Sequence, residues 1–111
     1  MKPGALLVLD VGNTNTVLGL YRGQELVESW RVATNPASTT DETGVLYMSL
    51  FAARGIDPGE VSAAIVSCVV PNAVHAISRA CSRYFDVEAR FVGSDIETGM
   101  QVDYANPREV G

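Results

Sequence analysis

Two uninterrupted apolar runs stand out in the hydropathy pattern of the chain. One covers residues 5–9 and the other residues 63–70, and neither alternates with polar positions. A strand that packs against neighbours on both of its faces has no polar side. Both runs therefore predict strands that are buried on both faces.

The residues after the first run predict two further strands joined by short turns. Val17–Tyr21 is apolar, and Arg22-Gly23-Gln24 is a tight-turn signal that leads into a strand over Glu25–Val32. Three consecutive strands connected in this way form an antiparallel meander. The candidate packing residues of the third strand are Leu26, Trp30 and Val32.

A capping signal predicts the first helix. Thr39 and Glu42 have the spacing of a capping box, which favours a helix from Thr40 to about Arg54 that ends at Gly55. The same role explains the acidic pair Asp41-Glu42, which could otherwise be mistaken for catalytic acids. The expected packing residues of this helix are Val45, Met48, Phe51 and Ala52.

A second helix is expected after Pro71, with Asn72 as its cap, and a short strand follows at residues 88–93. The residues that line one face of this helix at helical spacing are Val74, Ile77, Ala80, Cys81 and Tyr84. His75 falls on the other face, which argues against a role as general base. The order of elements predicts an α/β fold, a mixed sheet with an N-terminal antiparallel meander and flanking helices.

The clearest candidate chemistry follows the first apolar run. Asp10 leads into a short polar turn, Gly12-Asn13-Thr14-Asn15. A carboxylate at the end of a buried strand is costly unless it has a partner, and a hydrated metal ion is one such partner. The backbone N–H groups and hydroxyls of the turn suit phosphate oxygens. The alternative is an ordinary hairpin whose turn is rich in Gly and Asn.

Composition narrows the class of protein. The chain has 111 residues and a net charge of −5, which argues against binding to nucleic acid. No apolar run reaches the roughly 18 residues that span a membrane, so a cytoplasmic protein is expected. Cys68 and Cys81 lie at apolar positions without metal-ligand spacing and are predicted to fill the core.

Several segments together resemble a known family. Asp10–Asn15 resembles the first phosphate motif of the acetate and sugar kinase/Hsp70/actin superfamily. The segments that resemble type III pantothenate kinases are Trp30-Arg31 with Thr34, Thr40-Asp41-Glu42, Ser67-Cys68-Val69-Val70-Pro71, and Gly99 through Tyr104-Ala105-Asn106-Pro107 to Val110-Gly111. They occur in the family's order and cover nearly the whole chain. One departure is Cys68, where the family pattern has serine.

The resemblance implies a fold and an activity. Such enzymes transfer the γ-phosphoryl group of ATP to pantothenate, the first step of coenzyme A synthesis. They have two domains of ribonuclease-H-like (actin-like ATPase) fold, and residues 1–111 correspond to the N-terminal domain. The resemblance also implies a homodimer, a divalent cation such as Mg²⁺, and a monovalent cation, K⁺ or NH₄⁺.

The resemblance assigns site residues as well. It implies metal binding by Asp10 and pantothenate binding by Tyr104 and Gly111. The segment that it matches to the ATP phosphates is Asp10, Val11, Gly12, Asn13, Thr14, Asn15, Thr16 and Val17. Gly111 matches the first residue of a Gly-x-Asp-Arg motif whose aspartate is the general base.

No residue of the chain is assigned as the catalytic base, although Asp103 is a candidate by type. The base and the second domain are expected beyond Gly111, so we expect these 111 residues alone not to phosphorylate pantothenate. The sequence is also compatible with two alternatives. One is another phosphotransferase of the superfamily, such as an exopolyphosphatase or a sugar kinase. The other is a nucleotide-binding regulatory or accessory module.

Overall fold

A computed structural model describes residues 4–93, which form one mixed five-stranded sheet in the order β3-β2-β1-β4-β5. The strands are β1 (Ala5–Val11), β2 (Asn15–Arg22), β3 (Glu25–Ala33), β4 (Val61–Cys68) and β5 (Ala89–Val92). The first three strands pair antiparallel, and β4 and β5 continue the sheet in parallel with β1. The predicted meander and the predicted mixed sheet are both confirmed.

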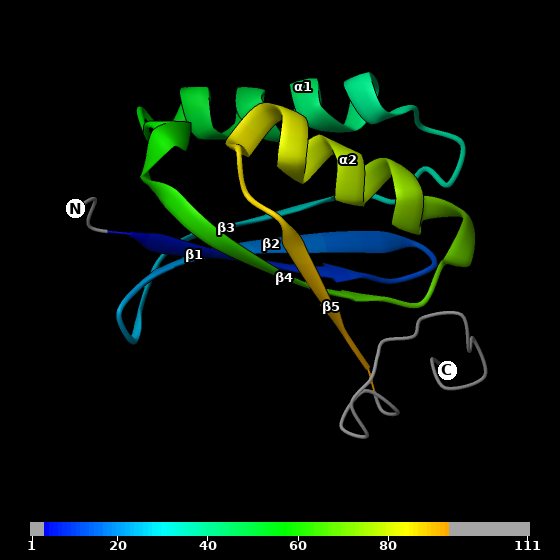
Figure 1. The fold of residues 1–111 in the computed structure, drawn as a ribbon, viewed down its shortest axis with the longest axis horizontal. Helices are drawn as coiled ribbons and strands as arrows, with labels where there is room; N and C mark the ends of the chain where they lie inside the picture. The colour runs from blue at the N-terminus through cyan, green and yellow to red at the C-terminus, as the bar shows by residue number, and fades with distance from the viewer. Residues whose placement is uncertain (1–3, 94–111) are drawn as a thin grey trace.

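Two helices lie together on one face of this sheet (Figure 1). They are α1 (Thr40–Ala53) and α2 (Val74–Phe85). Two short 3₁₀ turns complete this part of the chain: η1 (Pro58–Glu60) precedes β4, and η2 (Pro71–Ala73) precedes α2. Within residues 4–93, no helix is long and apolar enough to cross a membrane.

Helices cover one face of the sheet and leave the opposite face without a helix among the described residues (Figure 1). Along β1, the side chains of Leu7, Leu9 and Val11 are buried beneath the helices, whereas Leu6 is half-buried and Asp10 is exposed. We call the side beneath α1 and α2 the covered face and the opposite side the open face. The prediction that β1 is buried on both faces is therefore wrong for the described residues, because both helices lie on the same side.

The second apolar run shows the same asymmetry. Its strand β4 begins at Val61 and ends at Cys68, two residues earlier at each end than the apolar pattern predicts. Val66 and Cys68 are buried on the covered face, but Ala63 is exposed on the other. Burial on both faces is thus wrong for this strand too.

Aromatic side chains form the centre of the core beneath the helices. The ring of Phe51 is fully buried, with ring centroids 5.2 Å from Trp30 and 5.1 Å from Phe85. The interpretation of Trp30 as a packing aromatic is confirmed. Leu26, in contrast, is 50% exposed on the open face beside Gly19, so its predicted role in packing is wrong.

The capping signals of α1 are confirmed. The backbone N–H of Glu42 donates to the Thr39 hydroxyl at 3.1 Å, and the backbone N–H of Thr39 donates to the Glu42 carboxylate at 2.9 Å. The helix ends before Gly55, whose φ of 69° is readily adopted by glycine. Glu42 therefore has a structural task, as predicted. Its neighbour Asp41 accepts a hydrogen bond from the Tyr84 hydroxyl at 2.7 Å.

The face by which α1 packs agrees with the prediction only in part. Phe51 is buried and Met48 packs against the core, as predicted. Val45 and Ala52 are exposed, and the helix also buries Thr43, Gly44 and Tyr47. The physical reason is a close approach to α2, since a Cβ on Gly44 would lie 2.2 Å from the ring of Tyr84 in that helix.

In α2 the predicted apolar face is confirmed, with Ile77, Ala80 and Cys81 buried and His75 exposed. The predicted cap is wrong. Asn72 belongs to the 3₁₀ turn η2, which precedes α2, and no side chain caps the helix.

Candidate functional site

The turn between β1 and β2 is tied to its neighbours by backbone hydrogen bonds. The Gly12 N–H donates to the Asn15 carbonyl at 2.9 Å, and the Thr34 N–H donates to the Thr14 carbonyl at 2.8 Å. On the other side, the Val69 N–H donates to the Val11 carbonyl at 3.0 Å. One hydrogen bond within the turn and two from segments distant in sequence thus hold this turn and the end of β1 in place.

Two backbone donors of the turn remain available. The N–H groups of Asn13 and Thr14 have no hydrogen-bond partner within residues 4–93, and both residues are exposed. Neither has a positive φ, although two-residue hairpin turns most often use such conformations. The connection is a hairpin in its strand pairing, but its turn differs from the commonest hairpin types. Successive free N–H groups of this kind can bind an anion by donating hydrogen bonds to it.

Gly12 leaves room for the tight closure of the turn. A Cβ at this position would lie 3.2 Å from the Asn15 carbonyl oxygen, closer than most such contacts. A larger residue would push against the oxygen that accepts the Gly12 N–H, so this position favours glycine for a steric reason.

Asp10 is exposed on the open face, one residue before the last residue of β1. The strand register pairs it with Val17 of β2 on one side and Ser67 of β4 on the other. Its carboxylate makes no hydrogen bond or ion pair with any residue in the described part of the chain. The carboxylate is therefore free to bind a ligand, and it avoids the cost of burial because it faces outward.

The segment that the resemblance matches to phosphate divides between the two faces. Asp10 and Val17 lie on the open face, whereas the side chains of Val11 and Thr16 are buried on the covered face. Asn15 is exposed at the start of β2. Tyr104 and Gly111, the predicted pantothenate residues, lie outside the described residues.

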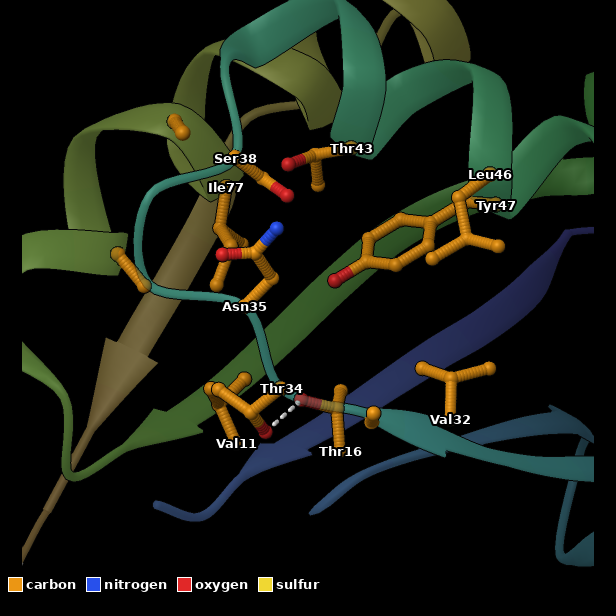
Figure 2. Close-up of a pocket in the computed structure, with 13 residues that line it drawn as sticks. Val11, Thr16, Val32, Thr34, Asn35, Ser38, Thr43, Leu46, Tyr47 and Ile77 are labelled. Carbon is orange, nitrogen blue, oxygen red and sulfur yellow. Dashed lines mark hydrogen bonds between the residues drawn. The ribbon is translucent and has the colours of Figure 1, made fainter. Parts of the chain in front are cut away.

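Beneath the turn, on the covered face, lies a cavity of about 70 Å³. Among the side chains that line it, the Thr16 and Thr34 hydroxyls are joined by a 2.7 Å hydrogen bond, and the Tyr47 hydroxyl points into the cavity (Figure 2). Burial raises the pKa of Tyr47, so its hydroxyl stays protonated. The hydroxyl pair connects the start of β2 to the segment after β3 and supports the turn from below.

Sequence reasoning gave Thr34 no individual role and did not single out Tyr47. Thr34 supports the turn twice, through its N–H and through its hydroxyl. The available signal was a β-branched polar residue directly after the third strand, but only the register of that strand shows which residue it meets. Tyr47 lies one helical turn before Phe51, and both are buried, but only Phe51 is among the predicted packing residues of α1.

Cys68, the departure from the family pattern, is buried at the end of β4. Its thiol donates to the Val70 carbonyl at 3.2 Å and accepts from the Val70 N–H at 3.4 Å. Burial raises the pKa of the Cys68 thiol, partly offset by the backbone hydrogen bond. The thiol therefore keeps a hydrogen-bonding role in shaping the segment that leads to Pro71. The interpretation of both cysteines as buried core residues is confirmed.

No group of three or more His, Cys, Asp or Glu side chains is positioned to hold a metal ion among residues 4–93. Asp10 is the carboxylate of this part of the chain that the sequence assigns to a metal, and it would bind the ion without a cluster of further protein ligands there. This arrangement suits Mg²⁺, which commonly keeps several waters and binds one or two carboxylates together with phosphate oxygens.

Comparison with known sequences shows the family. The family model for type III pantothenate kinase matches residues 6–111, and the chain belongs to this family. Type III pantothenate kinase of Myxococcus xanthus is 50% identical over 106 residues, and that of Syntrophobacter fumaroxidans is 48% identical. Each match covers 96% of this chain and 41% of the relative, so the chain spans less than half the length of these proteins.

Solved structures with a related arrangement include the Ppx/GppA phosphatase of Aquifex aeolicus. One such structure has a TM-score of 0.47 and 12% identity, covering 80% of this chain and 35% of that one. Independently of that match, the observed meander, parallel strands and helices agree with the ribonuclease-H-like class expected from the sequence.

Proposed function

We propose that the complete protein containing this chain phosphorylates pantothenate with ATP, yielding 4′-phosphopantothenate for coenzyme A synthesis. Within it, residues 1–111 form the N-terminal ribonuclease-H-like domain, which binds the phosphates of ATP. The observation that carries this proposal is an unpartnered carboxylate, Asp10, near the end of the strand that leads into a turn with two unpartnered N–H groups, those of Asn13 and Thr14. Membership of the type III family supports pantothenate as the acceptor.

The free donors of the turn would bind phosphate oxygens. Backbone N–H groups fixed by Thr34 and Asn15 need no rearrangement to receive an anion, which is the basis of electrostatic preorganisation. Phosphoryl transfer depends mainly on such positioning and on charge neutralisation. The turn would therefore orient the triphosphate.

Asp10 would hold the hydrated divalent cation. A bound Mg²⁺ neutralises charge that develops on the phosphate oxygens during transfer. The Asp10 carboxylate lies outside the core and has no competing partner in the described part of the chain. It thus fits the role of a metal ligand, and we assign proton acceptance from pantothenate to another residue.

The remaining roles follow the family resemblance. We propose that Tyr104 and Gly111 contribute to the pantothenate site and that the aspartate of the Gly-x-Asp-Arg motif is the general base. We further propose a cytoplasmic homodimer that uses a monovalent cation, K⁺ or NH₄⁺. Neither nucleic acid nor a membrane is expected as a partner, given the net charge of −5 and the lack of long apolar runs.

The test is an assay of ADP release by the complete purified protein. ADP should form only when ATP, Mg²⁺ and pantothenate are all present, with 4′-phosphopantothenate identified by mass spectrometry. Sugars and polyphosphate serve as comparison substrates. ATP binding without any pantothenate-dependent turnover would contradict the proposal and favour a regulatory nucleotide-binding module.

A further inference from the structure

Arg31 lies on the same face of the sheet and in the same row as Asp10. Asp10 pairs with Val17 in the β1·β2 ladder, and Val17 pairs with Arg31 in the β2·β3 ladder. Directly paired residues of neighbouring strands project from the same face. The row across the open face therefore reads Arg31, Val17, Asp10 and Ser67.

The spacing of this row suits a ligand that carries both a metal and a phosphate chain. Neighbouring strands lie about 4.8 Å apart, so the backbones of β1 and β3 are about 10 Å apart. Only Val17, an apolar residue, lies between them. The long side chain of Arg31 can reach back across Val17, so a cation and a carboxylate flank one apolar position.

Arg31 has no partner within the described residues. Three other arginines there form ion pairs, namely Arg22 with Glu60, Arg54 with Glu28 and Arg83 with Asp41. The guanidinium of Arg31 is exposed and forms no such pair. Its five donors are therefore available to an incoming anion.

Arg90 provides an internal comparison. It also lies on the open face without a partner among residues 4–93, and β5 is likewise two strands from β1. Its row, however, contains Ile65 and Val8, two residues further from the turn than Asp10. Arg31 shares the row of the proposed metal ligand, and Arg90 does not.

We propose that Arg31 binds phosphate oxygens of the nucleotide whose divalent cation is held by Asp10. This inference rests on the proposed function, because it requires the triphosphate to lie over the open face near the turn. Guanidinium groups bind phosphate through paired hydrogen bonds, an arrangement that lysine or glutamine does not reproduce. Arg31 thereby adds a side-chain cation to a site whose other donors are backbone N–H groups.

The experiment measures binding of Mg·ATP and of adenosine to the complete protein by calorimetry. Arg31→Gln should weaken Mg·ATP binding by about 10- to 100-fold, the range expected for losing a hydrogen bond to a charged group. Adenosine, which has no phosphate, should bind Arg31→Gln as it binds the wild type. Arg31→Lys should recover part of the affinity, since lysine keeps the positive charge but lacks the paired donors of the guanidinium group.

Arg90→Gln is the matched control, with the same charge change on the same face, and should leave Mg·ATP affinity within about twofold. Equal losses in Arg31→Gln and Arg90→Gln would overturn the assignment, because they would indicate a general charge effect. Unchanged affinity in Arg31→Gln would overturn it as well. If that variant also self-associated, Arg31 would instead be a charge that protects the edge strand β3 from pairing.

The same titrations separate this inference from the proposed function. If wild-type protein binds Mg·ATP and Arg31→Gln binds it equally well, only the role of Arg31 is lost. If the wild type fails to bind Mg·ATP, the proposed function and the role of Arg31 are both contradicted. Unfolding midpoints should be the same for all variants, because these arginines are exposed and have no partner in the described part of the chain.

Discussion

The covered and open faces of this sheet use their side chains differently. On the covered face, Phe51 and its aromatic neighbours fill the core, and the buried Thr16 hydroxyl is paired with Thr34. On the open face, Asp10 and Arg31 stand in one row without partners among residues 4–93. A charged group without a partner contributes little to folding, so its presence beside a prepared turn points to a ligand.

The contrast between the two faces predicts which measured property of the protein each substitution should change. Substitutions on the covered face should change the free energy of unfolding, whereas substitutions in the row of Asp10 should change ligand binding and leave stability nearly constant.

Phe51→Ala should have the largest effect. The ring is fully buried and contacts both Trp30 and Phe85, so its removal should lower the free energy of unfolding by about 3–5 kcal/mol. Urea unfolding measures the loss. Leu26→Ala, on the open face, is the matched control and should cost less than about 1 kcal/mol. Similar losses in the two variants would remove the distinction between the faces.

Gly44→Ala should destabilise the contact between the two helices. The new methyl group would lie 2.2 Å from the Tyr84 ring, so one helix must move, at a cost of about 1–3 kcal/mol. A double-mutant cycle with Tyr84→Ala checks the cause, because removing the ring should abolish most of the penalty. An equal penalty with and without the ring would show that the close approach is not responsible.

Thr34→Val keeps the shape of the side chain and removes the hydroxyl that bonds Thr16. It should lower the free energy of unfolding by about 1 kcal/mol, since a buried hydroxyl loses its partner. Thr34→Ser keeps the hydroxyl and should restore most of this loss in the same chemical unfolding measurement. If the serine variant were as unstable as the valine variant, the hydrogen bond would not be the source of stability.

The thiol of Cys81 gives a prediction on pH. Burial raises its pKa from 9.0 to about 11 in the folded protein, so the folded state holds its proton more tightly than the unfolded state. Cys81 should therefore contribute a loss of stability as the pH rises from about 9 to about 11, and none below that range.

Two comparisons test this. At pH 8 the native protein should react slowly with a thiol reagent and the urea-unfolded protein quickly. Replacing Cys81 with alanine should remove part of the alkaline decline in the unfolding midpoint. An unchanged decline would assign it to other groups.

Local signals in the sequence predicted the elements well. The Thr39–Glu42 capping box, the glycine after the first helix and the apolar face of α2 depend on neighbours in the chain, and all three are confirmed. The meander could also be predicted, because short turns leave consecutive strands no choice but to pair. These features require no knowledge of what each element packs against.

Features that depend on distant contacts could not be predicted. The packing face of α1 is set by the approach of Gly44 to Tyr84, a contact between residues 40 positions apart, and Val45 looked equally suitable as a core residue. Apolar runs suggested strands covered on both faces, but composition does not say on which side a crossover helix will lie. Both helices lie on one side (Figure 1).

The candidate site was predictable in part for the same reason. Asp10 and its turn are local in sequence, and they could be singled out by residue type alone. The support from Thr34 and the alignment of Arg31 with Asp10 arise from the register between strands. A pattern of residue types does not contain this register.

The most direct test of the account is a calorimetric titration of Mg·ATP into wild-type protein and Asp10→Asn, with the unfolding midpoint of each measured in parallel. We predict that Asp10→Asn loses at least about tenfold in Mg·ATP affinity and keeps the wild-type midpoint, because its carboxylate is exposed and has no partner within residues 4–93. Wild-type affinity in Asp10→Asn, or a large fall in its midpoint, would contradict the claim that this aspartate serves a ligand on the open face.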